Sequence, residues 1–297
     1  MTDVLLISNP SSGSSDEALL SSVRGELSPL GSMADVQPSS LESFEEEVKG
    51  ARSGASVVIV AGGDGTFNCT VNALSDLFDE VTLGLVPMGT GNDFGRTLGL
   101  PEDPLDAARA IARGARREID VGRASSGTDA RLFVNACMGG FPVDVNEAID
   151  EGVKKRFGPL AFWVGGLKAA KDLTRYRISL DGHELDEVLA VGVGNGQTCG
   201  GGIRVWPDAR PDDRRLDACA LAAASLPEAL QLASKVRDGN HLGLEGVTTA
   251  AGERLVVDAE PRIEFNVDGD LVGMTSPVTF ELAGRFTVLA PADAQVA

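Results

Sequence analysis

The first 120 residues alternate between short apolar runs and longer amphipathic stretches. The apolar runs predict strands near residues 3–8, 33–37, 56–60 and 82–86. The stretches between and after them predict helices near residues 15–27, 41–52, 66–78 and 104–113. Short apolar runs rich in β-branched residues are typical of strands that are buried on both faces. We therefore predict an α/β domain with a parallel sheet and helices on both of its faces.

The pattern changes near Asp120-Val121-Gly122, where short β-rich pieces separated by glycine, proline and aspartate begin. Examples are Arg131–Val134, Tyr176–Leu180, Leu189–Val193 and Arg254–Asp258. This composition favours a mainly antiparallel β-sandwich, with helices around residues 145–172 and 226–237. We expect residues 1–122 and 123–297 to form two domains, with Phe286–Leu289 as a candidate strand returning to the first. A chain of 297 residues is long enough for two cores.

Glycines follow the third predicted strand, in the segment Ala61–Asn68. Because glycine has no Cβ, the backbone can turn sharply there and approach a ligand closely. Thr66 is predicted to cap a helix that runs to about Leu77, and the first N–H groups of that helix favour an anion. Asp64 would repel a bare phosphate but could hold a metal-bound one. The segment therefore predicts a site for a phosphate together with a cation.

A second glycine-rich turn, Pro87–Gly95, follows the next strand. Turns that follow consecutive parallel strands lie at the carboxyl edge of the sheet, where open α/β folds bind ligands. Neither turn matches G-x-x-x-x-G-K-[ST] or G-x-G-x-x-G, so the common P-loop and dinucleotide motifs are absent. The alternative is that the glycines serve only the geometry of two tight turns.

Five segments, in order, resemble the diacylglycerol kinase catalytic family, in its soluble prokaryotic lipid kinase branch. Two of them are Gly62-Gly63-Asp64-Gly65-Thr66-x-Asn68 and Pro87-x-Gly89-Thr90-Gly91-Asn92-Asp93-Phe94. The others are Asn9–Gly13, Gly200–Ala209 and Asn266–Asp270. The resemblance implies a diacylglycerol-kinase-like or NAD-kinase-like fold with the active site in the cleft between its domains, ATP as phosphoryl donor, and Mg²⁺.

The resemblance also implies which residues contact the nucleotide. They are Asn9, Pro10, Ser11, Gly62, Gly63, Asp64, Gly65, Thr66, Asn68, Thr90, Gly91, Asn92 and Asp93. Phosphoryl transfer further needs a group that accepts the proton of the acceptor hydroxyl. Asp268-Gly269-Asp270 matches the family's D-G-E motif, with aspartate in place of glutamate. We favour Asp270 as this base, Asp268 as a residue that orients it or the metal, and Asp64 as the third catalytic residue. The alternative is a charged turn at a hairpin tip, because Asp-Gly is a common hairpin signal.

The segment Pro211–Asp217 stands where the family has D-D-G-x-L-D. The resemblance implies a structural Mg²⁺ held by the Asp213 side chain and the carbonyls of Arg210 and Arg215, an all-oxygen set that suits a hard cation. Arg214 replaces the expected glycine, and we expect it to resist a backbone with positive φ. The alternative is a solvated loop. The family's lysine after the first motif is also missing, since Ser14 follows Gly13.

The chain is strongly acidic, with 44 Asp and Glu against 26 Lys and Arg and a net charge of −18. This charge works against binding to nucleic acid or to an anionic membrane by bulk electrostatics. We hypothesise a halophilic source, because molar salt screens self-repulsion; equal stability from low to molar KCl would contradict it. The four cysteines show no C-x-x-C spacing, which predicts structural thiols. With no 18-residue apolar stretch or signal peptide, the sequence predicts a cytoplasmic protein.

The acceptor side carries the longest basic run, Lys154-Lys155-Arg156, followed by the aromatic-rich segment Phe157–Val164. Basic residues beside exposed aromatics can dock a protein peripherally on a bilayer. The alternative is a helix that buries Phe162 and Trp163. The resemblance to the diacylglycerol kinase family implies an ATP-dependent lipid kinase acting on a diacylglycerol-like hydroxyl. A NAD kinase-type enzyme and a catalytically lapsed nucleotide-binding regulator are the alternatives, and the oligomeric state, a homodimer included, stays open.

Overall fold

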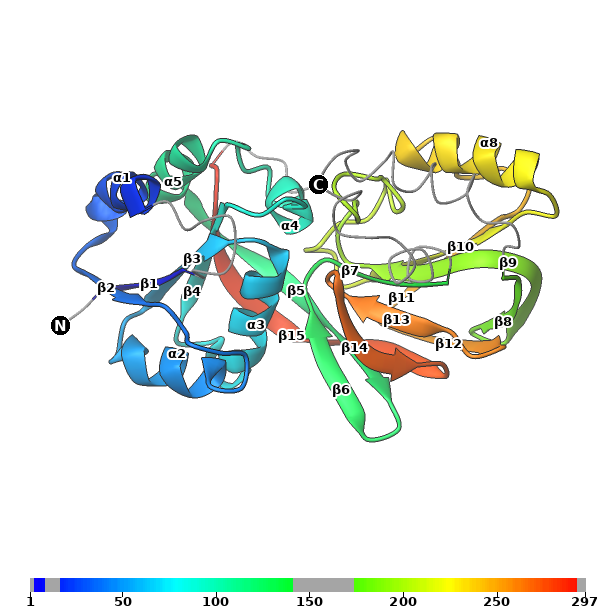
Figure 1. Cartoon of the computed structure of the whole chain (residues 1–297), viewed down its shortest axis with the longest axis horizontal. Coiled ribbons are helices and arrows are strands. Elements are labelled where there is room, and N and C mark those ends of the chain that lie inside the picture. The colour runs from blue at the N-terminus through cyan, green and yellow to red at the C-terminus, as the bar shows by residue number, and fades with distance from the viewer. Residues whose placement is uncertain (1–2, 9–16, 141–173, 293–297) are drawn as a thin grey trace. The chain divides into compact units, whose positions relative to one another are not determined.

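The computed structural model describes residues 3–8, 17–140 and 174–292 (Figure 1). The chain divides into two compact units, one made of Met1–Val121 with Gly284–Ala297 and the other of Gly122–Ala283. Two long strands, β5 (Ala115–Ser126) and β15 (Val278–Ala290), pass from one unit into the other. In the described residues, no helix is long and apolar enough to cross a membrane.

The N-terminal unit is built on the predicted parallel sheet. Its strands are β1 (Val4–Ser8), β2 (Met33–Val36), β3 (Val57–Gly62) and β4 (Thr82–Pro87), in the order β2-β1-β3-β4. The end of β15, which includes the candidate returning strand Phe286–Leu289, adds beside β4 in parallel, with Thr287 opposite Thr82. Strands β1, β3 and β4 are buried along their whole length, which explains their continuous apolar runs.

Helices cover both faces of this sheet (Figure 1). Helices α1 (Glu17–Leu27) and α5 (Pro104–Ala112) pack together on one side, and α2 (Phe44–Arg52) and α3 (Asp64–Ala73) on the other. The shorter helices are η1 (Ser28–Leu30), η2 (Ser75–Leu77) and α4 (Asp93–Thr97). The sequence did not predict α4, because five residues are too few to show a helical period.

The start and end of α3 differ from the prediction. Gly63, in extended backbone (φ −96°, ψ −175°), is the N-cap residue, and no side chain caps the helix. Thr66 therefore lies inside the first turn, and its predicted role as the cap is wrong. The helix ends at Ala73 because Leu74 leaves helical backbone (φ −103°, ψ 15°), and η2 follows as a separate turn. Glycine is a tolerated N-cap residue, so the helix can begin two residues earlier than expected.

The C-terminal unit is a mainly antiparallel β-sandwich. Its strands are β6 (Asp129–Phe133), β7 (Ala136–Gly140), β8 (Tyr176–Leu180), β9 (His183–Gly194), β10 (Leu216–Ala222), β11 (Val247–Gly252), β12 (Arg254–Glu260), β13 (Glu264–Val267) and β14 (Asp270–Thr275). One hydrophobic core draws buried side chains from most of these strands, among them Phe265, Phe280 and Val257. Alternating exposure along β8 and β12 fits strands with one face on that core.

Helix α8 (Leu226–Arg237) has the predicted bounds and packs Leu232 and Val236 on a second buried cluster. Its start is set locally, because the Ser225 hydroxyl accepts the N–H of Glu228 and the Glu228 carboxylate accepts the N–H of Ala224. The helices predicted around residues 145–172 lie outside the described residues. The four cysteines are free thiols, as the spacing predicted, and burial raises the pKa of Cys219 to about 12.

Candidate active site

The two glycine-rich turns of the N-terminal unit touch each other through their backbones. A Cβ added to Gly89 would lie 2.6 Å from the Cα of Gly63, which no side chain can tolerate. A Cβ added to Gly63 would lie 3.2 Å from the Cα of Gly89. These glycines are therefore required for close packing between the ends of β3 and β4. Both glycines thus have a packing role, and their contact with a nucleotide stays a prediction.

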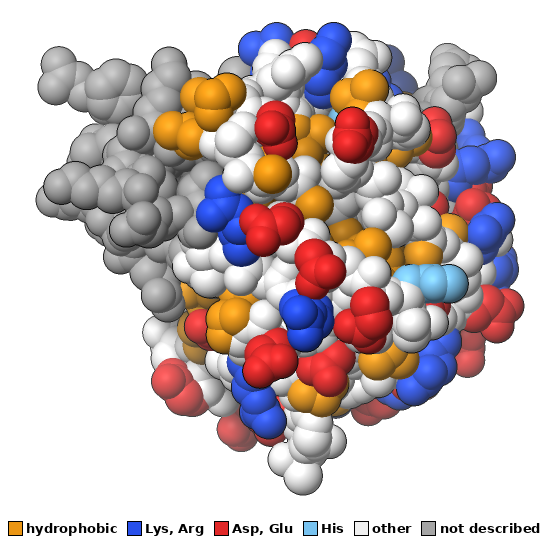
Figure 2. Space-filling model, turned by 90° about the vertical axis from the view of Figure 1, so that its right-hand side faces the viewer, with side chains coloured by type: hydrophobic (Ala, Val, Ile, Leu, Met, Phe, Trp, Pro, Cys, Tyr) orange, Lys and Arg blue, Asp and Glu red, His pale blue; other side chains and the backbone are white. Residues whose placement is uncertain are grey.

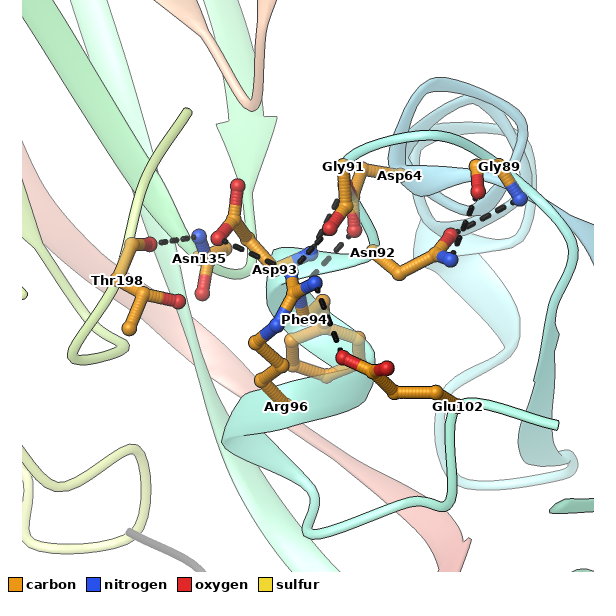
Figure 3. A network of polar contacts seen from close by, with 10 residues as sticks. All are labelled: Asp64, Gly89, Gly91, Asn92, Asp93, Phe94, Arg96, Glu102, Asn135 and Thr198. Carbon is orange, nitrogen blue, oxygen red and sulfur yellow. Dashed lines mark hydrogen bonds and ion pairs between the residues drawn. The ribbon is translucent and has the colours of Figure 1, made fainter. Parts of the chain in front are cut away.

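Asp64 joins the first turn to the second (Figure 3). Its carboxylate oxygens accept the backbone N–H groups of Asp93 at 3.0 Å and Phe94 at 3.1 Å. The carboxylate thus caps the first turn of α4 from another element, 29 residues away in the chain. Three phenylalanine rings pack at the same junction, since the ring centroid of Phe67 lies 4.9 Å from that of Phe94 and 6.2 Å from that of Phe286.

The second turn is closed by its own side chains. The Asn92 amide accepts the N–H of Gly89 at 2.9 Å and donates to its carbonyl at 2.8 Å, with Asn92 in left-handed backbone (φ 52°). The Arg96 guanidinium donates to the carbonyl of Gly91. These bonds fix the turn while the Thr90 side chain remains exposed. Thr90 is therefore the residue of this turn that is best placed to meet a ligand from solvent.

The other predicted nucleotide contacts differ in exposure. Gly65 and Thr66 lie in the first turn of α3 and are half-buried. Asn68 is completely buried, and its side-chain oxygen accepts a bond from Asn72 at 3.0 Å. The Asn68 side chain therefore stabilises α3 and has no exposed surface to offer a ligand. Asn9, Pro10 and Ser11 lie outside the described residues.

In the C-terminal unit, Asp268 and Gly269 form the two-residue turn between β13 and β14. Both have positive φ, 48° and 95°, as a type I′ hairpin turn requires. The Asp268 carboxylate is buried and accepts three backbone N–H groups, from Val134 at 2.9 Å, Asn135 at 3.0 Å and Ala136 at 2.9 Å. A carboxylate held in this way fixes the hairpin and is poorly suited to take up a proton.

Asp270, two residues further on, has a different environment. It is the first residue of β14 and its side chain is exposed. Nearby protein atoms still displace part of the water around the carboxyl, and this raises the pKa of Asp270, while the positive charge of Arg131 opposes the shift. A carboxylate with a raised pKa is a stronger base, and the exposed Asp270 side chain can be reached from solvent whereas Asp268 is buried.

The sequence analysis missed two buried asparagines that organise this region. Asn135 donates from its amide to the carbonyl of Thr198 at 2.7 Å, and Asn195 donates to the carbonyl of Val134 at 2.8 Å. The backbone N–H of Asn195 also donates to the carbonyl of Asn135 at 2.8 Å. The segment that Asp268 holds is thereby tied to the loop after β9. An asparagine that ends an apolar run, as in Val134-Asn135 and Gly194-Asn195, is the signal that could have revealed them.

The loop around Asp213, where a metal was predicted, has positive φ at Arg214, the position where the family has glycine. Arg214 has φ 66°, so the expectation that it resists this backbone is wrong. The Asp213 carboxylate accepts the N–H of Arg215 at 3.0 Å, which stabilises the turn locally. Burial and the charges of Asp213 and Asp208 raise the pKa of Asp217 to about 6. Folding therefore disfavours the ionised form of Asp217, and the positive charge of Arg215 offsets only part of this effect.

This raised pKa predicts a pH-dependent stability. The folded-state pKa of Asp217 lies above its unfolded value, so its favourable contribution is present below about pH 4 and is lost as pH rises through about 6. We expect Asp217→Asn to raise the free energy of unfolding at pH 7.5 but not at pH 4, measured by denaturant unfolding in EDTA. Asp129→Asn, an exposed aspartate on β6, controls for the loss of one charge. An equal gain at both pH values would contradict the prediction.

Comparison with known proteins gives the family. A family model described as the diacylglycerol kinase catalytic domain matches residues 3–124, and one described as the YegS C-terminal NAD kinase beta sandwich-like domain matches residues 135–290. "Diacylglycerol kinase" of Bacillus subtilis (strain 168) is 31% identical over 241 residues, covering 80% of this chain and 78% of that protein. The chain belongs to the diacylglycerol kinase family. It is therefore a kinase, a class of phosphotransferase that uses a nucleotide as donor.

Two further similarities extend over most of the kinase. A Xanthomonas oryzae pv. oryzae (strain MAFF 311018) protein named "Probable lipid kinase YegS-like" is 32% identical over 267 residues, 86% of each chain. A crystal structure from Bacillus anthracis str. Sterne, described as a "putative diacylglycerol kinase", has a TM-score of 0.81 at 26% identity. It covers 97% of this chain and 95% of its own. The resemblance that the sequence motifs indicated is confirmed, as is the α/β and β-sandwich fold.

Proposed function

We propose that this kinase is an ATP-dependent lipid kinase that transfers the γ-phosphate of ATP to the hydroxyl of a diacylglycerol-like lipid. The observation that carries the proposal is the Asp268–Asp270 hairpin, in which one buried carboxylate fixes the turn and an exposed carboxylate of raised pKa is left to accept a proton. The names of the similar proteins support a lipid as the acceptor.

The donor side of the proposal is the N-terminal unit. Helix α3 has no side-chain cap, and the first N–H groups of a helix have no partner within it. Those groups and the positive end of the helix dipole favour the phosphates of ATP. The Thr90 hydroxyl, exposed on the second turn, is the proposed additional contact.

Replacing Thr90 tests this assignment. Thr90→Val keeps the size and β-branching and removes one hydroxyl, so we expect ATP binding to weaken by about 0.5–3 kcal/mol, depending on the charge of the partner. Calorimetric titration with ATP and Mg²⁺ measures the change. Thr128→Val, an exposed threonine in the β5–β6 turn, is a matched control that should bind ATP normally. An unchanged affinity in Thr90→Val would remove Thr90 from the proposed site.

Mg²⁺ is the proposed metal, and the loop at Asp213 is its proposed site. Burial, together with the charges of Asp213 and Asp208, raises the pKa of Asp217, and a hard cation nearby would favour the ionised carboxylate. Carboxylate and carbonyl oxygens suit such a cation. We propose that Asp213 and the carbonyls of Arg210 and Arg215 hold it, so that the metal supports the loop. In the described residues no cluster of three or more His, Cys, Asp or Glu side chains is arranged for a metal, and two of the three proposed ligands are backbone carbonyls.

The acceptor side of the proposal is the C-terminal unit. As the hydroxyl oxygen of the lipid forms its bond to the γ-phosphorus, its proton passes to the Asp270 carboxylate and the bond from phosphorus to ADP breaks. Asp268 takes no part in this proton transfer, because its oxygens are bound to backbone N–H groups. Asp268 positions the turn that carries the base.

We also propose a cytoplasmic enzyme that docks peripherally on a membrane. On the face shown in Figure 2, Lys and Arg side chains are interspersed with acidic ones and do not gather in one patch. The docking proposal rests on the basic run Lys154, Lys155 and Arg156, which lies outside the described residues. Liposome co-sedimentation of a variant with these three changed to glutamate tests it, and equal binding would contradict it.

The deciding experiment is phosphate transfer from labelled ATP to a panel of lipid extracts, with NAD⁺ as a separate acceptor. A labelled lipid supports the proposal and identifies the acceptor. Labelled NADP⁺ without labelled lipid would favour the NAD kinase-type alternative. ATP binding without transfer to any acceptor would favour the catalytically lapsed regulator.

A further inference from the structure

Two exposed apolar side chains follow the proposed base directly. Leu271 is 42% exposed and Val272 is 38% exposed. Other large hydrophobic side chains of the described residues are similarly exposed, such as Leu244 at 42%, but they lie on other elements. A single exposed apolar residue needs no explanation, whereas an adjacent pair beside a reactive carboxylate does.

An irregularity in β14 accounts for this exposure. Leu271 lies opposite Asn266, but Met274 lies opposite Phe265, so β14 has two extra residues, Val272 and Gly273, between these pairs. Gly273 has φ 70°, which allows the chain to bend outward there. Met274, just beyond the bulge, is buried again. Bulges of this kind are frequent next to active sites, where they redirect side chains.

The surroundings of Asp270 make this end of β14 amphipathic. The β5–β6 hairpin is tied to β14, because the Ser126 hydroxyl donates to the carbonyl of Thr275 at 2.7 Å. Arg131 of that hairpin acts electrostatically on Asp270. A molecule that places a hydroxyl at Asp270 would therefore lie beside charged protein side chains at its hydroxyl end. Its neighbouring part would lie beside the apolar side chains of Leu271 and Val272. An alcohol attached to a hydrocarbon chain has the matching chemistry.

We propose that Leu271 and Val272 contact the hydrocarbon part of the acceptor, next to the hydroxyl presented to Asp270, and so select acceptors that carry an acyl or alkyl chain. The inference rests on the proposed function and adds a specificity surface to it. A second protein strand is a poorer occupant, because the bulge interrupts the row of backbone groups that strand addition needs. Two side chains are also far too small an area for a stable protein interface.

The test compares Leu271→Ser and Val272→Ser with Leu244→Ser. Leu244 is equally exposed and belongs to the same unit, but it lies on the loop after α8. Initial rates are measured with dihexanoyl and dioleoyl glycerol in mixed micelles. We expect each variant at β14 to raise KM for the dioleoyl acceptor about fivefold, with a smaller change for the dihexanoyl one. Leu244→Ser should keep both values.

The outcomes separate the two proposals. If the unchanged enzyme phosphorylates neither glyceride nor any other lipid, the proposed function fails and this inference with it. If it phosphorylates both but the β14 variants keep its chain-length preference, the inference fails alone. Sedimentation velocity tests whether a second copy of the chain contacts the pair instead of a lipid. If the unchanged enzyme is a dimer and Leu271→Ser is a monomer, the pair belongs to a contact between copies and the inference is overturned. Thermal unfolding verifies that each variant is folded, and Leu271→Ala provides a milder change.

Discussion

Asp270→Asn is expected to lower kcat by about 10²–10⁴-fold while leaving ATP affinity nearly unchanged. Asparagine keeps the shape of the side chain but cannot accept a proton as a carboxylate does. Because the side chain is exposed at the start of β14, the fold should be unaffected. Single-turnover transfer from labelled ATP and a separate ATP titration measure the two quantities. Asp258→Asn, an exposed aspartate on β12 of the same unit, is the control and should keep normal kcat.

The pH profile provides a second readout for Asp270. A general base is active only when ionised, and the Asp270 pKa is raised above 3.8. As pH is lowered, kcat should therefore begin to fall at a higher pH than it would with an ordinary aspartate as base. Asp270→Asn should abolish this acidic limb of the pH profile. Asp270→Glu restores the residue that the family usually carries, and retained activity would show that the site accepts the longer side chain. Full activity in Asp270→Asn would exclude Asp270 as the base.

Asp64→Ala is expected to abolish measurable transfer and also to destabilise the N-terminal unit. The loss of transfer follows from the expected role of Asp64 as the third catalytic residue. The structure adds that the N–H groups of Asp93 and Phe94 would lose their acceptor, and an unsatisfied buried donor costs about 1–3 kcal/mol. Thermal unfolding and transfer assays are run on the same preparation, below the melting temperature of the variant.

Asp103→Ala separates the two effects. The Asp103 carboxylate caps α5 and likewise accepts two backbone N–H groups, from Leu105 and Asp106 at 2.9 and 3.0 Å, but it is not on a glycine-rich turn. Its loss should destabilise the same unit by a similar amount and leave kcat of the folded enzyme unchanged. If Asp103→Ala is as inactive as Asp64→Ala, instability explains both variants and Asp64 has no special role in transfer.

Several features of the fold were set by local sequence. The buried strands of the N-terminal unit show in short apolar runs, because both faces of each strand are covered. The bounds of α8 follow from Ser225 and Glu228, which cap its start within four residues of chain. The Asp268-Gly269 turn was predictable for the same reason, since positive φ at both positions selects these residue types.

The sequence could not predict contacts between residues far apart in the chain. Thr66 looked like a helix cap because the pattern does not show that Gly63, packed against Gly89, already holds the required backbone. Arg214 adopts left-handed backbone that its residue type disfavours, because the surrounding turn sets it.

By itself, then, the sequence determined the order of strands and helices, the two glycine-rich turns and the kinase family, because each of these depends on residues close together in the chain. Only the tertiary structure decided what the carboxylates do. Asp64 binds N–H groups 29 and 30 residues away, and Asp268 binds one 134 residues away. Asp270, two residues from Asp268, remains exposed with a raised pKa. Such roles depend on which backbone groups and charges the fold brings within a few ångströms of each carboxylate, and the residue types do not record this.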